Sequence, residues 1–298
     1  MAEDQVGFSK DIEMNLSPNP FLTEEIIEEV MLKYFPGPMP IESITISRNF
    51  KNDLLSKLRE TEKAKYIIGV VPYPKAETLI PAEHWEGFKI IMDAEAYGEE
   101  FQAYLGLIHE LCHVRDLDLY FRRFGYIHTK PLSMLRKLYY PEFLIWSEYI
   151  AVKNSFEHCV DLFGKIHPHE SISLEIEVEV PEMHKLYHQM IAEEKKDPRF
   201  ADAVKMETAV MVERFLKVYF AGNMAKIELN NRSFSDLVGG QKMVMEDVME
   251  LRHFIFDDEL KELGKLLDES DNFDSAVFRL KNMAVCYNGI IEKLKKII

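Results

Sequence analysis

The chain has 298 residues and carries 36 Lys and Arg against 51 Asp and Glu, which gives a formal net charge of -15. This acidic balance disfavours a nucleic-acid-binding surface or an anchor for anionic membranes as the main role. With 47% hydrophobic and 29% charged residues, the composition is that of a folded globular protein. The N-terminus is acidic and no run reaches about 18 apolar residues, so neither secretion nor a membrane span is predicted. The three cysteines are far apart and odd in number, which favours a reducing cytoplasm.

Short elements are predicted for the first 100 residues. Thr23 can cap a helix over 24–34, and the PGPMP segment that follows would end it. Brief β-branched runs separated by Pro, Gly and charged residues predict the strands of a small sheet. These runs are 44–47, 66–71 and 88–93.

Two long helices are predicted next. The segment 99–124 indicates one helix that Gly125 ends, and a second helix begins at Pro141 and ends at Gly164. The sequence therefore predicts an α+β fold for the first half of the chain.

The rest of the chain is expected to be mainly helical. Strict alternation of apolar residues over 171–180 predicts one strand, and Asp197-Pro198 opens a helix to about 221. A boundary near 165–170 would separate a domain over 1–165 from a helical region over 166–298.

The strongest chemical signal is His109-Glu110-Leu111-Cys112-His113, an H-E-x-x-H sequence inside a predicted helix. Four residues are just over one turn, so both imidazoles project from one face and can bind a single ion at about 2.0 to 2.1 Å. Glu110 can accept a proton from water that the ion acidifies and pass it to a leaving amine. The motif predicts one Zn²⁺ per chain, with Glu110 as general base.

The helix around this motif is apolar on almost every side, which predicts that it is buried. Buried imidazoles need polar partners, and a metal ion supplies them. Gly106, one turn before His109, leaves room for another side chain to approach the same face.

A third ligand must come from elsewhere in the chain. Asp116 lies about 10 Å of helix from His109, so it cannot join both histidines on one ion. The metzincin continuation also fails, because Asp116 and Leu119 stand where that class has Gly and His.

Glu148 is the better candidate for the third ligand. It lies in a helix segment, 143–152, that is otherwise almost entirely apolar, and an unpaired buried carboxylate is costly. The small residues Ala151 and Ser155 on its face favour close packing against the motif helix. His158 is a weaker alternative, because it points to a different face.

H-E-x-x-H followed 35 residues later by Glu148 in an E-x-x-A helix resembles the gluzincin metallopeptidases. The short sheet before the motif is similar to that of the ImmA/IrrE-type zincins, and the resemblance covers roughly residues 20–165. It implies a zincin-like sheet packed on the H-E-x-x-H helix, in a cytoplasmic zinc peptidase that cuts a regulatory partner. The implied zinc ligands are His109, His113 and Glu148, with Glu110 as base.

Other roles stay open in the sequence. Zincins carry a strand that pairs with extended substrate, and 88–93 is a candidate by analogy. His184 and His188 have the spacing of a second metal site without a flanking acidic motif. The oxyanion of the reaction needs a His, Tyr or Arg, and no residue is singled out. The available candidates are Tyr139, Tyr140, Tyr149, His184 and His188.

We therefore expect a zinc-dependent metallopeptidase domain over 1–165 and a mainly helical region over 166–298 that selects a peptide or protein substrate. The alternative is a regulatory or interaction protein that keeps a zincin-like core with a structural or vestigial metal site. A third hypothesis, that the motif is a coincidence in a metal-free helix, predicts no zinc in the purified protein.

Overall fold

The computed structural model describes residues 12–58, 63, 74–81, 83, 85–163 and 257–297. The chain divides into two compact units, Met1–Pro131 with Asn154–Lys165, and Leu132–Lys153 with Ile166–Ile298. The boundary predicted near 165–170 lies outside the described residues and stays a prediction.

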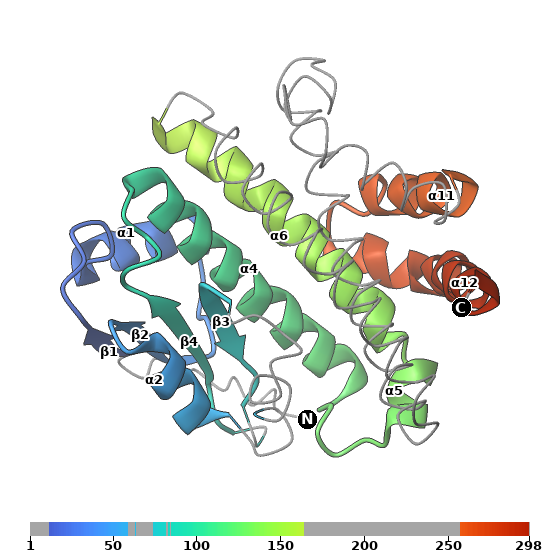
Figure 1. Cartoon of the computed structure of the whole chain (residues 1–298), viewed down its shortest axis with the longest axis horizontal. Helices are drawn as coiled ribbons and strands as arrows, with labels where there is room; N and C mark the ends of the chain where they lie inside the picture. The colour runs from blue at the N-terminus through green and yellow to red at the C-terminus, as the bar shows by residue number, and fades with distance from the viewer. Residues whose placement is uncertain are drawn as a thin grey trace, which may run out of the picture. The chain divides into compact units, whose positions relative to one another are not determined.

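The first unit contains a mixed four-stranded sheet (Figure 1). The strand order is β1-β2-β4-β3. β1 pairs with β2 and β2 with β4 in parallel, whereas β3 pairs with β4 in the antiparallel direction. β4 therefore has a neighbour on both sides, and β3 lies at an edge. The strands are β1 (Glu13–Leu16), β2 (Ile41–Ser47), β3 (Ala76–Leu79) and β4 (Phe88–Asp93).

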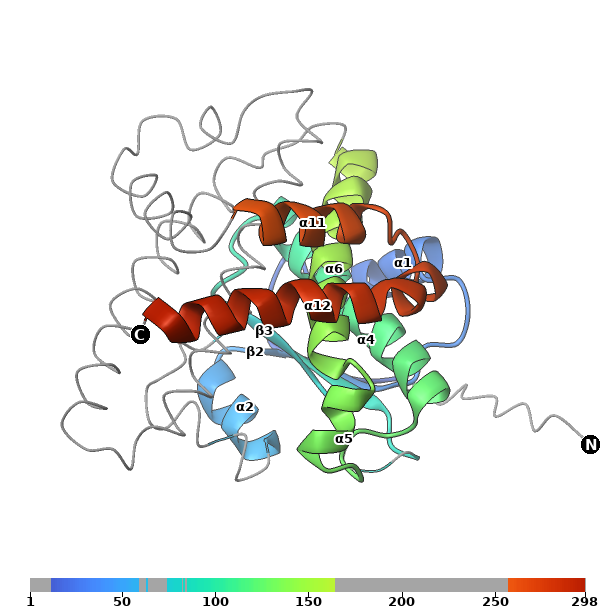
Figure 2. The same ribbon diagram turned by 90° about the vertical axis from the view of Figure 1, so that its right-hand side faces the viewer.

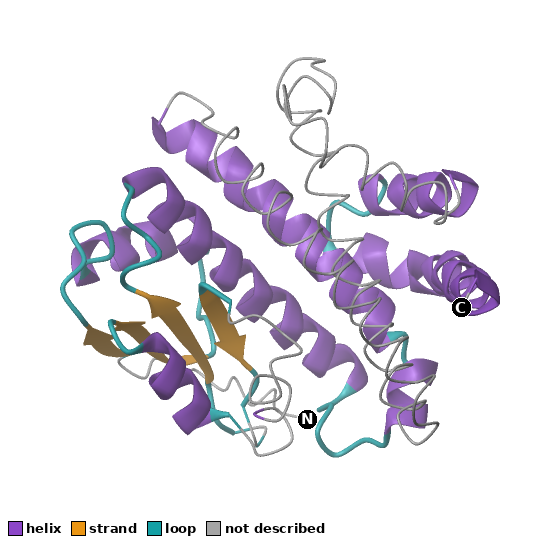
Figure 3. Cartoon of the chain, in the orientation of Figure 1, coloured by secondary structure: helices purple, strands orange, loops and turns teal. Residues whose placement is uncertain are grey.

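The two faces of the sheet bury different side chains, and Figure 3 shows the helices beside the strands. Helix α2 (Phe50–Lys57) lies against one face, where Phe50 and Leu54 form a core with Ile91. The alternate residues, among them Ile44 and Ile90, pair across β2 and β4 and are fully buried on the opposite face. Alternation along the strands thus gives the sheet two apolar faces.

The helices of the first unit follow the sequence predictions closely. Helix α1 (Glu24–Tyr34) begins at Thr23, whose hydroxyl accepts from the Ile26 N–H at 3.4 Å. Helix α4 (Glu100–Phe124) contacts β3 and ends at Gly125, which has a φ of 76°. The capping and C-terminal glycine signals are therefore confirmed.

The second unit is helical in its described part. It contains α5 (Leu132–Lys137), the first part of α6 (Tyr140–Phe163), α11 (Asp257–Asp268) and α12 (Phe273–Ile297). Helices α11 and α12 run side by side (Figure 2). The predicted elements 66–71, 171–180 and 198–221 lie outside the described residues.

None of the described helices combines the length and the apolar character that crossing a bilayer requires.

Candidate metal centre

Helix α4 presents two imidazoles side by side. His109 and His113 lie one turn apart, and their Nε2 atoms are 3.0 Å from each other. The two rings are nearly perpendicular, with an interplanar angle of 85°, and the short distance between their Nε2 atoms brings both nitrogens to one spot. This is the arrangement that the i, i+4 spacing of the motif predicts.

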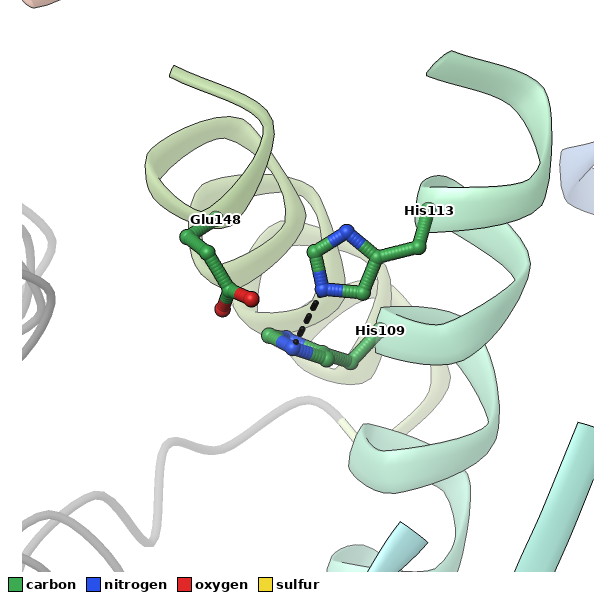
Figure 4. A group of neighbouring side chains, drawn as sticks. All are labelled: His109, His113 and Glu148. Atoms are coloured by element: carbon green, nitrogen blue, oxygen red, sulfur yellow. Dashed lines mark hydrogen bonds between the residues drawn. The ribbon is translucent and has the colours of Figure 1, made fainter. Parts of the chain in front are cut away.

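Glu148 completes the group from helix α6 (Figure 4). One ligand atom from each of His109, His113 and Glu148 lies within 4.8 Å of the others, and all three side chains are half-buried. The structure thus brings together the three residues that the sequence predicted as metal ligands, and this group could hold a metal ion.

The donor set and spacing fit a first-row metal such as zinc. Tetrahedral ligands at about 2.0 to 2.1 Å from an ion lie about 3.3 Å apart, close to the 3.0 Å between the two Nε2 atoms. The Glu148 side chain has three rotatable bonds, so its carboxylate can move the short distance that separates it from an ion bound to the two imidazoles. Two imidazoles and one carboxylate leave a fourth position for water, as in catalytic zinc sites.

Glu110 is buried at 7% exposure and stands apart from this group. The hydroxyl of Thr78 on β3 donates to its carboxylate Oε2 at 2.6 Å. Thr78 shares a sheet face with Ile90, its partner on β4. The edge strand therefore fixes the carboxylate predicted to be the general base. Sequence reasoning missed Thr78, because the short segment AETL carries no strong strand signal.

The topology corrects one sequence expectation. β4, the segment 88–93, was the candidate for pairing with extended substrate, but its two edges are occupied by β2 and β3. Strand order cannot be deduced from the sequence of one strand, which explains the error. Within the part of the chain that the structure describes, the outer edge of β3 pairs with no other strand.

Gly106 allows a close approach, as the sequence predicted, and the approaching group is Tyr97. A Cβ atom at Gly106 would lie 2.6 to 2.7 Å from the Tyr97 ring and hydroxyl. Tyr97 itself is buried. Tyr97 therefore packs on α4 at the level of Gly106, one helical turn before His109.

Asp116 does not belong to the group of His109, His113 and Glu148. It is 1% exposed and accepts from Arg115 Nε at 2.8 Å, so its carboxylate is buried against a half-buried guanidinium. Burial raises the pKa of the Asp116 carboxyl, and Arg115 offsets part of this effect. Burial also raises the pKa of the Cys112 thiol, to about 12, so this cysteine stays protonated near neutral pH.

The remaining candidates do not belong to the ligand group or lie outside the described residues. His158 stacks on Tyr34, with ring centroids 4.2 Å apart. The Tyr149 hydroxyl donates to the Asp268 carboxylate. His184 and His188 are not described, and the structure assigns no oxyanion role to Tyr139 or Tyr140.

Comparison with protein-family models, with curated proteins and with solved structures gives no match. The resemblance to gluzincins and to ImmA/IrrE-type zincins therefore stays a prediction from the motif.

Proposed function

We propose that the chain is a zinc-dependent metallopeptidase, with Zn²⁺ held by His109, His113 and Glu148. The observation that carries this proposal is the meeting of the three ligand atoms within 4.8 Å. The group joins the H-E-x-x-H helix to a glutamate 35 residues further along the chain, and two imidazoles with one carboxylate form a known catalytic zinc set.

The chain's own residues supply the acid–base part of the reaction. When bound, zinc supplies the Lewis acidity that acidifies water and polarises a carbonyl. Glu110 takes the proton of the attacking water and delivers it to the leaving amine. The Thr78 hydroxyl, at 2.6 Å from Oε2, orients this carboxylate.

An extended peptide is the substrate class that the edge strand supports. β3 is the last strand in the order of the described sheet, and a peptide that lies along it by β-augmentation would run beside the strand that holds Glu110. Three free, buried cysteines agree with a reducing compartment such as the cytoplasm.

The test compares wild type with Glu110→Gln on a peptide library, at equal zinc content, with products identified by mass spectrometry. We expect Glu110→Gln to keep its zinc and to lose cleavage by at least about 1000-fold, because it removes the base. Glu28→Gln, an exposed substitution on α1, is the matched control and should cleave like wild type.

Equal cleavage by Glu110→Gln and wild type would contradict the mechanism. If zinc-loaded wild type cleaves nothing in the library, the alternative gains support, namely a binding protein whose metal is structural.

A further inference from the structure

The helix that carries Glu148 is held on its other side by a turn far along the chain. The Trp146 indole N–H donates to the Ser270 carbonyl at 2.7 Å, and both residues are at most 1% exposed. The Tyr149 hydroxyl donates to Asp268, the last residue of α11. Two residues that flank Glu148 are therefore tied to positions about 120 residues later.

These contacts lie on one face of α6. Trp146, Tyr149 and Lys153 follow i, i+3, i+7 spacing, and Lys153 adds an ion pair of 3.0 Å with Asp271. At about 100° per residue, Glu148 projects about 130° away from the middle of this face. The turn thus holds the side of the helix opposite to the metal ligand.

The turn itself is well defined by local hydrogen bonds. The Ser270 hydroxyl donates to the Leu266 carbonyl at 2.6 Å. Asn272 and Ser275 exchange side-chain to backbone bonds of 3.0 and 3.2 Å, the reciprocal pattern of a helix N-cap. Phe273 packs against Trp146 with ring centroids 6.2 Å apart. The hydrogen bonds within the turn therefore fix the positions of the two acceptors that bind α6, the Ser270 carbonyl and the Asp268 carboxylate.

Rotation of α6 decides where the ligand points. A carboxylate on a helix of about 11 Å diameter moves about 2 Å when the helix rotates by 20°. Metal–ligand distances tolerate only about 0.2 Å. A contact that fixes the rotation of α6 consequently acts on the affinity for the ion.

We propose that the turn 268–273 is a positioning element of the metal centre and sets its zinc affinity by fixing the rotation of α6 through Trp146 and Tyr149. This inference rests on the metal centre of the proposed function. It makes Asp268 and Ser270 positioning residues for Glu148, although neither belongs to the ligand group.

The experiment measures the zinc affinity of the full chain by competition with a chromophoric chelator. Tyr149→Phe removes one hydroxyl and keeps the ring, and we expect zinc affinity to fall about 10-fold, at the lower end of the range for residues that orient ligands. Asp268→Ala should have a similar effect, and Asp268→Asn, which keeps an acceptor oxygen, should recover most of it. Tyr104→Phe on α4 is the matched control, with less than about a 2-fold change.

A second experiment, in the Glu148→Ala variant, distinguishes an effect on the position of Glu148 from a general loss of protein stability. In Glu148→Ala the turn has no ligand left to position, so adding Tyr149→Phe should leave zinc affinity unchanged. The visible spectrum of the Co²⁺-loaded protein should change in Tyr149→Phe and not in Tyr104→Phe, because it reports ligand geometry.

Equal zinc affinity of wild type and Tyr149→Phe would overturn the inference and leave the metal centre intact. An equal loss in the Glu148→Ala background would overturn it as well, by showing that the effect does not pass through Glu148. Absence of zinc binding by wild type would overturn the proposed function together with the inference.

Discussion

The two helices that supply the metal ligands are held in place in different ways. Helix α4 is anchored by segments that precede it by a few tens of residues at most, with Tyr97 against Gly106 and Thr78 on the side chain of Glu110, 32 residues later. Helix α6 is anchored beside Glu148 by Asp268 and Ser270, which lie about 120 residues away. The helix of the histidine pair is therefore held by segments that lie within 32 residues of their partners, whereas the helix of the glutamate depends on a turn about 120 residues away.

The local anchor of α4 can be broken at Gly106. Gly106→Ala places a methyl group 2.6 to 2.7 Å from the Tyr97 ring and hydroxyl, so either tyrosine or helix must shift. We expect a loss of about 2 kcal/mol in the free energy of unfolding, measured by urea denaturation, because overpacking outweighs the helix propensity of Ala.

Gly289 in α12 is the matched helical control. Its nearest neighbour would be the Glu259 Cγ at 3.5 Å, which is an ordinary contact. Gly289→Ala should therefore gain about 0.5 kcal/mol from helix propensity. The same sign for both substitutions would contradict the close packing of Tyr97 on α4.

The link between β3 and the proposed base can be tested at Thr78. Thr78→Val keeps the shape and removes the hydroxyl that donates to Glu110. We expect zinc content to stay unchanged and peptide turnover to fall about 10-fold, because the carboxylate loses the hydrogen bond that orients it. An unchanged kcat with unchanged zinc would show that β3 does not position the base.

Helix α6 carries a buried carboxylate, Glu142, that lowers the stability of the fold when it is ionised. This residue is 5% exposed, its Oε2 has no hydrogen-bond partner among the residues that the structure describes, and burial raises the pKa of its carboxyl. The folded state therefore binds a proton more readily than the unfolded state, and stability falls as the pH rises through the raised pKa.

Glu142→Gln removes this cost. We expect it to stabilise the fold by about 1 kcal/mol at pH 7 and to have no effect below about pH 4, where the carboxyl is protonated in both states. Thermal unfolding at the two pH values checks this, and a gain of equal size at both would contradict the burial of the charge.

The smallest effect is expected at the exposed end of the α6 contacts. The Lys153 pair with Asp271 is open to solvent, with Asp271 70% exposed. Lys153→Ala should change stability by less than about 0.5 kcal/mol and zinc affinity by less than about 2-fold. If Lys153→Ala lowered zinc affinity as much as Tyr149→Phe does, the exposed ion pair would hold α6 in place, and not the buried hydrogen bonds.

Features that depend on nearby residues could be predicted from the sequence. Thr23 and Gly125 mark helix ends because capping is local chemistry, and the histidine spacing defines one helical face. Glu148 stood out because a carboxylate in an apolar helix needs a partner. These signals name the three residues that the structure brings together.

Features that depend on pairing between distant segments could not be predicted. β1 and β3 have four residues each and no β-branched run, so their existence and the order β1-β2-β4-β3 emerge only in the fold. The wrong choice of 88–93 as substrate strand follows from this. Nothing in the sequence around Tyr149 indicates that its partner is Asp268.

The most direct test of the metal centre is the zinc content of protein purified without chelator or a His tag, measured by elemental mass spectrometry. We predict about one zinc per chain in wild type and a strong reduction in both His113→Ala and Glu148→Ala. Zinc retained in Glu148→Ala would place the third ligand elsewhere. No zinc or other transition metal in wild type, even after supplying it, would contradict the metal centre itself.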